Sequence, residues 1–465
     1  MTTRRTHTAQ LARLAVLVAC GGAVSAATAQ ADYSFEQVTE FGFGTSVFEV
    51  SIAQASADRI AFRTTGSLDG PNDGGNFEVF LYDIPSATFT QVTDTPFGIG
   101  NFTPLLTPDG GTIVFRSLFD FVGDGQGGQF ELYEYDVAAQ TFSRLVNIAA
   151  GQVREDYRMS GDGRYVVFVT AADLTGGNPD GNFEVFRVDR TDGSVVQVTD
   201  STSGLRSFPD ISGDGRFVVY AQNNPNNVML WDALDGSTTN LTNQSGTNSR
   251  VDAPQISDDG RFVSFYSLRG FDPNQPSLNG LQVIDRDAGT ITRVARPAID
   301  NDDNDPFTME MAPDGSAVFF ESDQQLGTLR DLYRYDIAAD TIERITTGTP
   351  LISDAALSTD ASRRYVSVAF DGTLAYRSEQ PELDPGADNS TGTNLDLFVA
   401  TAPAEPCPGD ATGDGLVNAD DLLVVLGAFG TAVAGGVADG DFDDSGTVNA
   451  DDLLVVLGAF GTACP

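Results

Sequence analysis

Lysine is absent from this sequence of 465 residues, so its 26 basic residues are all arginine, and histidine occurs once, at His7. His7 lies in an amino-terminal segment that we expect to be removed. Without these two residue types, the mature chain cannot form a Ser-His-Asp triad, a histidine-ligated zinc site or a Schiff-base lysine. Any catalysis would have to use Asp, Glu, Tyr and Arg.

Long apolar runs are also missing, and the apolar segment near the amino terminus is short. Residues 1–31 place three arginines before or within the stretch Leu11–Val24, and a small-x-small site ends at Ala31. This pattern is typical of a secretory signal peptide cut after Ala31, since the apolar part is too short to span a bilayer. A second interpretation is a bacterial lipoprotein box that leaves Cys20 lipidated. We expect a secreted or cell-surface protein without a transmembrane segment.

Charge of one sign dominates, because 66 acidic residues face 26 arginines for a formal net charge of −40. Removal of residues 1–31 takes away three arginines and no acid, so the mature chain is more acidic still. Such a surface repels nucleic acid and anionic lipid and attracts divalent cations. Adaptation to salty surroundings explains the same composition. We therefore expect no nucleic-acid partner.

Asp-Gly pairs between two apolar runs recur through most of the chain. They stand at Asp109-Gly110, Asp162-Gly163, Asp214-Gly215, Asp259-Gly260, Asp314-Gly315 and Asp371-Gly372, with a degenerate first copy at Asp58. Such a pair, flanked by β-branched and aromatic residues, predicts a hairpin turn because both residues tolerate positive φ. Steps of 45 to 57 residues between copies indicate a repeat architecture.

Seven copies of a four-stranded unit predict an all-β, seven-bladed β-propeller over residues 32–401. The third strands begin at Phe77, Phe130, Phe183, Val228, Leu281, Asp331 and Leu395. A fourth strand follows the first six of them but not the seventh, and Phe35–Glu40 repeats its pattern at the amino terminus. We expect this amino-terminal strand to complete the last blade and close the ring, leaving only short edges. An Ala-Pro-rich linker follows at 402–406.

The strand-[Ser/Thr/Ala]-x-Asp-Gly-strand hairpin, followed by an acid and an apolar strand, resembles the WD40-like propeller repeat of the TolB family. The resemblance covers residues 33–401 and implies the propeller fold. It implies little about function, because propellers host binding, scaffolding and catalysis alike. TolB-type propellers usually have six blades, so a count of seven departs from that pattern. Trp231-Asp232 is the single Trp-Asp pair, which argues against a true WD40 array.

Two columns of mostly acidic positions follow from aligning the third strands. The first holds Glu78, Glu131, Glu184, Asn227, Gly280, Asp331 and Asp396, and the second holds Asp83, Asp136, Asp189, Asp232, Asp285, Asp336 and Thr401. The first column is either a functional ring of carboxylates or a set of structural acids that bind N–H groups of neighbouring loops. We favour the structural interpretation, because these positions repeat with the fold.

A site particular to this chain should break the repeat. The loops that do so are 68–76, 120–129, 174–182 and 298–306. The last of these is either a calcium site or, as we favour, a solvated acidic loop.

From Cys407 the chain becomes small and acidic, and Val417–Ala432 recurs almost unchanged as Val448–Ala463. Each copy follows an oxygen-rich loop with calcium-loop spacing. Positions 1, 3, 5, 7, 9 and 12 are Asp410, Thr412, Asp414, Leu416, Asn418 and Asp421 in the first loop, and Asp441, Asp443, Ser445, Thr447, Asn449 and Asp452 in the second. Ca²⁺ needs about six to eight oxygens around a sharply turned loop. The sequence predicts two Ca²⁺ ions in a small α-helical module over residues 407–465.

A duplicated loop followed by a single helix resembles the dockerin family, whose members bind cohesin modules. Residues 407–465 look like the short carboxyl-terminal dockerin-like anchors of secreted bacterial proteins, which implies a cohesin-like or cell-surface partner. Ala419-Asp420 and Ala450-Asp451 stand where cellulosomal dockerins often carry a partner-reading Ser-Thr pair, a departure from a standard cohesin ligand. Dockerin termini lie close together, so in an exported protein we expect a Cys407–Cys464 disulfide worth ~4 kcal/mol.

These patterns favour a secreted propeller that binds or scaffolds, with carbohydrate or protein as its ligand, attached through a calcium-dependent tail. The alternative is an extracellular polysaccharide-degrading enzyme, a lyase or a glycosidase, because dockerins often carry such cargo. An enzyme of the glycosidase type would need a pair of carboxylates at a suitable separation, and the sequence singles none out. We assign no catalytic residue. A prolyl oligopeptidase is excluded, since its hydrolase domain is missing.

Overall fold

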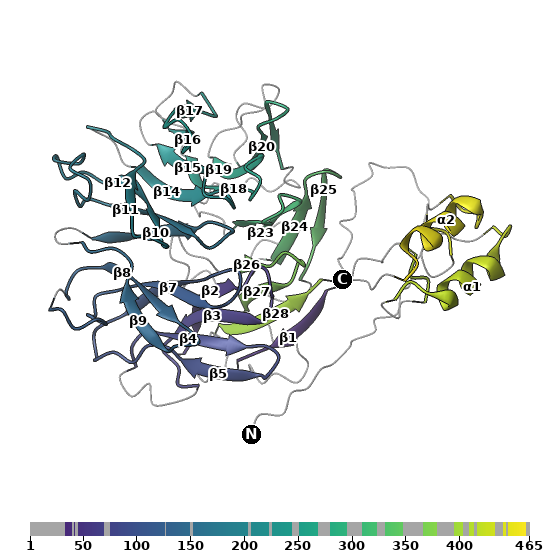
Figure 1. Ribbon diagram of the computed structural model, residues 1–465, viewed down its shortest axis with the longest axis horizontal. Helices are drawn as coiled ribbons and strands as arrows, with labels where there is room; N and C mark the ends of the chain where they lie inside the picture. The colour runs from purple at the N-terminus through teal and green to yellow at the C-terminus, as the bar shows by residue number, and fades with distance from the viewer. Residues whose placement is uncertain are drawn as a thin grey trace. The chain divides into compact units, whose positions relative to one another are not determined.

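The chain folds into seven four-stranded antiparallel sheets and two short helices in the computed structural model (Figure 1). The structure describes residues 33–39, 41, 45–68, 75–125, 127–148, 152–202, 206–222, 226–243, 251–267, 280–294, 309–322, 331–346, 366–378, 395–402, 409–412, 416–432, 440–442 and 445–461. Contacts divide the chain into two compact units, Met1–Ala402 and Pro403–Pro465. Across the described ranges, neither helix is long and apolar enough to cross a membrane.

The seven sheets are the blades of a β-propeller, as the repeats predict. First strands of neighbouring blades contact one another, so each blade runs outward from the centre. Blades 1 to 3 comprise β2 Val47–Ile52, β3 Arg59–Thr64, β4 Glu78–Asp83, β5 Thr88–Gln91; β6 Asn101–Leu106, β7 Thr112–Ser117, β8 Glu131–Asp136, β9 Thr141–Arg144; and β10 Val153–Met159, β11 Tyr165–Thr170, β12 Glu184–Asp189, β13 Val195–Gln197. Blades 4 to 6 comprise β14 Arg206–Ile211, β15 Phe217–Gln222, β16 Asn227–Asp232, β17 Thr238–Asn240; β18 Val251–Ile256, β19 Phe262–Ser267, β20 Gly280–Asp285, β21 Thr290–Arg293; and β22 Met309–Met311, β23 Ala317–Ser322, β24 Asp331–Asp336, β25 Thr341–Arg344. Blade 7 comprises β26 Val366–Val368, β27 Leu374–Ser378, β28 Asp396–Thr401 and, outermost, β1 Ser34–Gln37.

The predicted closure by the amino-terminal strand is confirmed. β1 pairs antiparallel with β28, with Ser34 opposite Thr401 and Gln37 opposite Phe398. The strand spans Ser34–Gln37 rather than the predicted Phe35–Glu40. Thr39 Oγ1 then donates to Asp396 Oδ1 at 2.9 Å, so the two ends of the propeller are joined by both backbone and side-chain bonds.

The Asp-Gly turns show why the repeat carries Ser-x-Asp-Gly. In blade 3, Ser160 Oγ accepts from the Tyr165 N–H at 2.9 Å and donates to Asp162 Oδ1 at 2.5 Å. Asp162 Oδ1 also accepts from the Arg164 N–H at 2.9 Å. Gly163 has a φ of +72°, whereas no aspartate of these turns has positive φ. Only the glycine therefore uses the backbone freedom that we expected of both residues.

The same glycines also make room for the preceding blade. A Cβ added to Gly215 of blade 4 would lie 2.1 Å from the Tyr165 ring of blade 3, and one on Gly260 of blade 5 would lie 2.5 Å from the Phe217 ring of blade 4. In blades 3, 4 and 5 an aromatic ring at the start of the second strand, Tyr165, Phe217 or Phe262, thus covers the next turn. The glycine serves the hairpin and the contact between blades at once.

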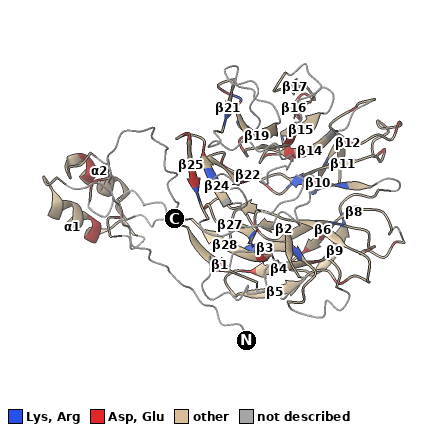
Figure 2. Cartoon of the chain, turned by 180° about the vertical axis from the view of Figure 1, so that it is seen from behind, with Lys and Arg blue, Asp and Glu red and all other residues tan. Residues whose placement is uncertain are grey.

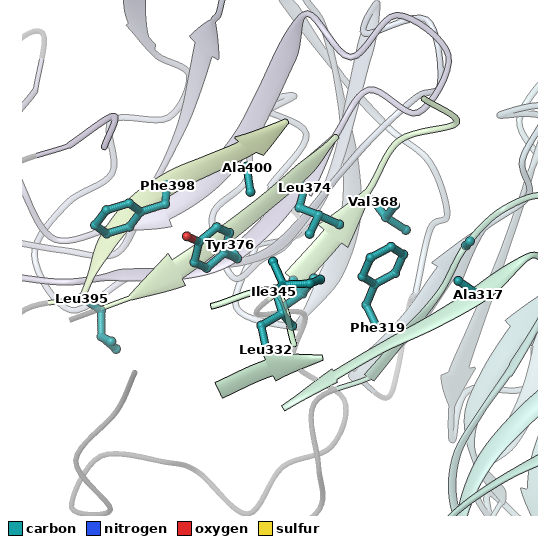
Figure 3. Close-up of a cluster of buried hydrophobic side chains, with 12 residues drawn as sticks. Ala317, Phe319, Leu332, Ile345, Val368, Leu374, Tyr376, Leu395, Phe398 and Ala400 are labelled. Atoms are coloured by element: carbon teal, nitrogen blue, oxygen red, sulfur yellow. The ribbon is translucent and has the colours of Figure 1, made fainter. Parts of the chain in front are cut away.

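Apolar clusters fill the spaces between neighbouring blades. Between blades 6 and 7, Phe319 and Leu332 face Leu374, Tyr376 and Phe398 (Figure 3). These side chains alternate along their strands with buried ones that pack against the other neighbouring blade, which is the period-2 pattern of the sequence. Each blade therefore needs both neighbours to bury its faces.

The carboxyl-terminal unit holds α1 Ala419–Ala428 and α2 Ala450–Ala459. Its core consists of four fully buried valines, Val417, Val425, Val448 and Val456. The Gly430 N–H after α1 donates to the carbonyl of Val448, and the Gly461 N–H after α2 donates to that of Val417. The two halves are thus interlocked, each helix end bonding to the other half's loop. The predicted all-β propeller with a small helical module is confirmed.

Candidate functional site

Each helix of the carboxyl-terminal unit begins with the aspartate predicted as calcium-loop position 12. Asp421 is fully buried, and its two oxygens accept from the Thr412 N–H at 2.9 Å and the Asn418 N–H at 2.8 Å. Asn418 caps α1 by accepting from the Asp420 N–H at 2.8 Å. Burial opposes ionisation of Asp421, but these hydrogen bonds outweigh it and hold its pKa below the ordinary value.

The second loop repeats this arrangement with different donors. Asp452 is fully buried and accepts from the Phe442 N–H at 2.6 Å and the Asn449 N–H at 2.8 Å. Asp441, at position 1, accepts from the Ser445 N–H at 3.1 Å and the Gly446 N–H at 2.8 Å. Carboxylates at positions 1 and 12 therefore fold the loop back onto the start of its helix.

This donor set fits a hard divalent cation. Residues 407–465 contain ten acids and no base, and Figure 2 shows Asp in red and no Lys or Arg along α1 and α2. Carboxylates buried without a counter-charge are costly, and Ca²⁺ would offset that cost. The described parts of the unit hold no ready-made group of three or more acids around one point.

Four of the predicted residues of this unit lie outside the described ranges. They are the ligands Asp414 and Asp443 and the cysteines Cys407 and Cys464. Of the other ten predicted ligands, Asp421 and Asp452 lie in the first turns of α1 and α2, and the remaining eight precede the helices. Calcium binding and the disulfide stay predictions.

Sequence reasoning missed the glycine that precedes each loop. A Cβ on Gly409 would lie 3.2 Å from the Cα of Val456 in α2, and one on Gly440 would lie 3.3 Å from the Cα of Val425 in α1. Each loop thus starts against the helix of the other half. The Gly-Asp pair at 31-residue spacing was the available signal.

Both helices expose an apolar face. Leu423, Leu426 and Phe429 are 64%, 51% and 48% exposed, and the equivalent residues of α2, Leu454, Leu457 and Phe460, are 64%, 51% and 49% exposed. No charged residue lies between Leu422 and Ala432. Contiguous exposed apolar side chains of this kind mark an interaction surface in a soluble protein.

In the propeller, acids of the first column fasten a strand to the following loop. Glu78, 1% exposed, accepts from Thr93 Oγ1 at 2.5 Å and from the Thr95 N–H at 2.8 Å. Burial raises the pKa of Glu78. Glu184 repeats the pattern with Thr199. The structural interpretation of this column is confirmed for these members.

Acids of the second column pair with an arginine at the start of the second strand. Arg216 donates to both oxygens of Asp232, at 2.9 and 2.8 Å, and Arg261 does the same with Asp285, at 3.1 and 2.8 Å. The hydrogen bond from Arg261 lowers the pKa of Asp285 to about 2. These pairs hold the outer turns of blades 4 and 5.

Two acids of the loop at 120–129 pair with an arginine of β9. Arg144 pairs with Asp120 at 3.3 Å, with Glu131 at 2.8 Å and with Asp124. A guanidinium therefore stands where a cation would bind. Loop 298–306 lies outside the described residues, so its predicted alternatives stay open.

A ring of buried side chains surrounds the centre of the propeller, one from the same register position of each innermost strand. Its members are Ser51, Leu105, Arg158, Asp210, Gln255, Glu310 and Ser367. Ser51 Oγ of blade 1 accepts from the Leu106 N–H of blade 2 at 2.9 Å. Gln255 Oε1 of blade 5 accepts from the Met311 N–H of blade 6 at 2.7 Å. Sequence reasoning missed this ring, whose signal is a polar residue within an apolar inner strand.

Similar folds occur among solved structures at low sequence identity. An oligogalacturonate lyase in complex with manganese shares 14% identity with this chain, with a TM-score of 0.56, over 81% of this chain and 95% of that one. An oligogalacturonate lyase from Vibrio parahaemolyticus shares 14% identity, with a TM-score of 0.52, over 81% and 99%. A TolB structure from Acinetobacter baumannii shares 16% identity, with a TM-score of 0.41, over 64% and 65%.

No protein-family model matches the chain, and no curated protein sequence matches it. At 14% identity the two lyase structures show a shared propeller fold and no more. The chain is a seven-bladed β-propeller followed by a small helical unit.

Proposed function

We propose that this chain is an exported propeller that binds or scaffolds, held to a cohesin-like or cell-surface partner by a calcium-dependent, dockerin-like tail. One observation carries the proposal: each half of the tail joins a loop folded around buried carboxylates to a helix with an exposed apolar face. The propeller's ligand is a carbohydrate or another protein.

Calcium would complete the fold of the tail. Two Ca²⁺ ions offset four of the ten acidic charges in residues 407–465, which contain no base. The twelve predicted ligands would hold the ions through carboxylate, hydroxyl, amide and backbone carbonyl oxygens. A Cys407–Cys464 disulfide would close the module by joining its two ends.

The exposed apolar faces of α1 and α2 indicate what kind of surface the partner would need. Leu423 and Leu426 on α1 have equivalents in Leu454 and Leu457 on α2, so the tail offers the same face twice. A partner with one complementary apolar patch could then engage either helix, in two orientations related by a pseudo-two-fold axis. The acidic rim of the module favours basic residues around that patch.

The second candidate is an extracellular polysaccharide-degrading enzyme, supported by the fold likeness to two oligogalacturonate lyases. One of those structures contains manganese. Because His7 is the only histidine of this chain, a manganese site here would consist of oxygen ligands. The ion pairs and hydrogen bonds of the two acid columns favour the binding role.

Retention of the full chain at the cell surface tests the tether. We expect deletion of residues 407–465, a calcium chelator, or the double substitution Leu423→Asp and Leu454→Asp to release the protein into the medium. Cys20→Ser is the control and should leave retention unchanged. Retention that survives the deletion but is lost in Cys20→Ser contradicts the tether and supports a lipid anchor.

A polysaccharide and glycan binding screen of the full chain, with parallel turnover assays, tests the role of the propeller. We expect binding without product release. Release of shortened or unsaturated products would overturn the binding role in favour of the enzyme.

A further inference from the structure

The Asp-Gly turns of blades 3 to 6 are joined edge to edge by backbone hydrogen bonds. The Asp162 N–H donates to the carbonyl of Gly213 at 2.9 Å, the Gly213 N–H to that of Asp258 at 2.9 Å, and the Asp258 N–H to that of Pro313 at 2.8 Å. Asp258 of blade 5 therefore bonds to the turns on both sides of it.

The side chain of Asp258 breaks the repeat at this position. The second residue of the seven turns is Gln54, Pro108, Gly161, Gly213, Asp258, Pro313 and Phe370, so Asp258 is the single carboxylate. A Cβ on Gly161 would lie 2.3 Å from Asp258 Oδ2, and one on Gly213 would lie 2.7 Å from Asp258 Cγ. Two glycines, from blades 3 and 4, thus form a notch that fits this carboxyl group.

Four acidic groups lie near the Asp258 carboxyl. Burial, and after it the charges of Asp210, Asp162, Asp259 and Asp314, raise the pKa of Asp258 to about 7. A cavity of ≈ 30 Å³, room for one or two waters, adjoins the carboxyl and is also lined by Asp210, Gln255 and Glu310.

The other two carboxylates of this cavity have hydrogen-bond donors of their own. Asp210 accepts from the Ile256 N–H at 2.8 Å, and Glu310 accepts from Gln255 Nε2 at 3.2 Å.

We propose that Asp258 is a proton-dependent latch that holds the turns of blades 3, 4 and 5 together. As a neutral acid it packs into the notch between Gly161 and Gly213 without charge repulsion. As a carboxylate it is repelled by Asp162, Asp210 and Asp314. Because of this repulsion, the turns of blades 3, 4 and 5 separate from one another.

The direction of the pH dependence follows from linkage. Folding raises the pKa of Asp258 above its ordinary value, so the folded state takes up a proton. The stabilisation is complete below about pH 4 and is lost as the pH rises through about 7.

Hydrogen exchange of the full chain, read on peptides that cover the three turns, tests the latch. In the wild type we expect protection, corrected for intrinsic exchange rates, to fall at least ~5-fold between about pH 5.5 and about pH 8.5. Asp258→Asn, which is neutral at both pH values, should stay protected at both. Asp200→Asn removes an exposed acid that is not among the groups acting on Asp258 and should follow the wild type.

Equal pH dependence in the wild type and in Asp258→Asn would overturn the proposal, and so would loss of protection in Asp258→Asn at both pH values. Gly161→Ala is a second test of the latch, because its added methyl group fills the notch and displaces the Asp258 carboxyl. We expect its turns to be unprotected at both pH values. A wild-type pH response in Gly161→Ala contradicts the latch.

Discussion

The propeller and the carboxyl-terminal unit are both acidic repeats, but their carboxylates have different partners. In the propeller, Glu49 and Arg63 form an ion pair at 2.6 Å with both side chains 1% exposed, and Asp232 pairs with Arg216 at 2.8 Å. Residues 407–465 contain no base, and among the described residues Asp421 is held by N–H and hydroxyl groups. Arginines of the propeller pair with some of its acids, whereas residues 407–465 contain no base that could do so.

Removing calcium should have the largest effect of these changes. It should destabilise the carboxyl-terminal unit and leave the propeller unchanged. In chelator we expect α1 and α2 to lose their protection from hydrogen exchange, because ten acids then repel one another without a counter-charge. The propeller strands should keep theirs. Full helix protection in chelator would contradict the calcium requirement.

A matched pair of variants sharpens the calcium prediction. Replacing the two buried acids, Asp421→Asn with Asp452→Asn, should weaken calcium binding at least ~10-fold by calorimetry, because each loop loses a charged ligand. Replacing their exposed neighbours, Asp420→Asn with Asp451→Asn, should change it little. Equal effects of the two pairs would mean that overall charge, and not the loop ligands, holds the ion.

The next largest effect belongs to the propeller, whose blades depend on close contact and not on ions. Gly215→Ala should lower the free energy of unfolding by about 3 kcal/mol, because φ is +74° and the new Cβ would meet the Tyr165 ring. Gly236→Ala, at a φ of +71° with nothing within 4 Å, should cost about 1 kcal/mol. Equal costs by denaturant titration would show that the contact between blades contributes nothing.

The smallest effect concerns two buried glutamines of blade 5. Neither amide atom of Gln282, fully buried, has a hydrogen-bond partner among the described residues. Gln255 makes three hydrogen bonds, to Met309, Glu310 and Met311. We therefore expect Gln282→Met to stabilise the protein by about 1 kcal/mol and Gln255→Met to destabilise it by about 2 kcal/mol. The same sign for both, in urea titrations, would contradict this account.

Comparison of the repeats shows that Gln282 departs from the residue type found at its position in most blades. Its position is aromatic in five other blades, as Phe80, Tyr133, Phe186, Tyr333 and Phe398, each stacked on a ring of the neighbouring strand. Alignment of the copies identifies the exception. Burial and the lack of a partner, however, become visible only when blade 5 is packed.

Much of the fold could be predicted because its signals are local. The Asp-Gly turns, the alternation of the strands and the displaced fourth strand at Phe35 together predicted seven blades and their closure. The bulges of the innermost strands were missed, although Thr103, Phe208 and Ala253 each have positive φ directly before a proline. A proline within an inner strand was the available signal, since it cannot donate to the ladder.

The sequence by itself determined the number of blades, the closing strand and the two loop-and-helix halves of the tail, because strand period, turn chemistry and duplication act over a few neighbouring residues. The tertiary structure alone decided which polar groups meet. Asp258 reaches Gly161 and Gly213, and Ser51 reaches Leu106, only because residues from different blades, 45 to 97 positions apart, lie side by side. Contacts between repeats depend on the closure of the whole ring, which no local pattern encodes.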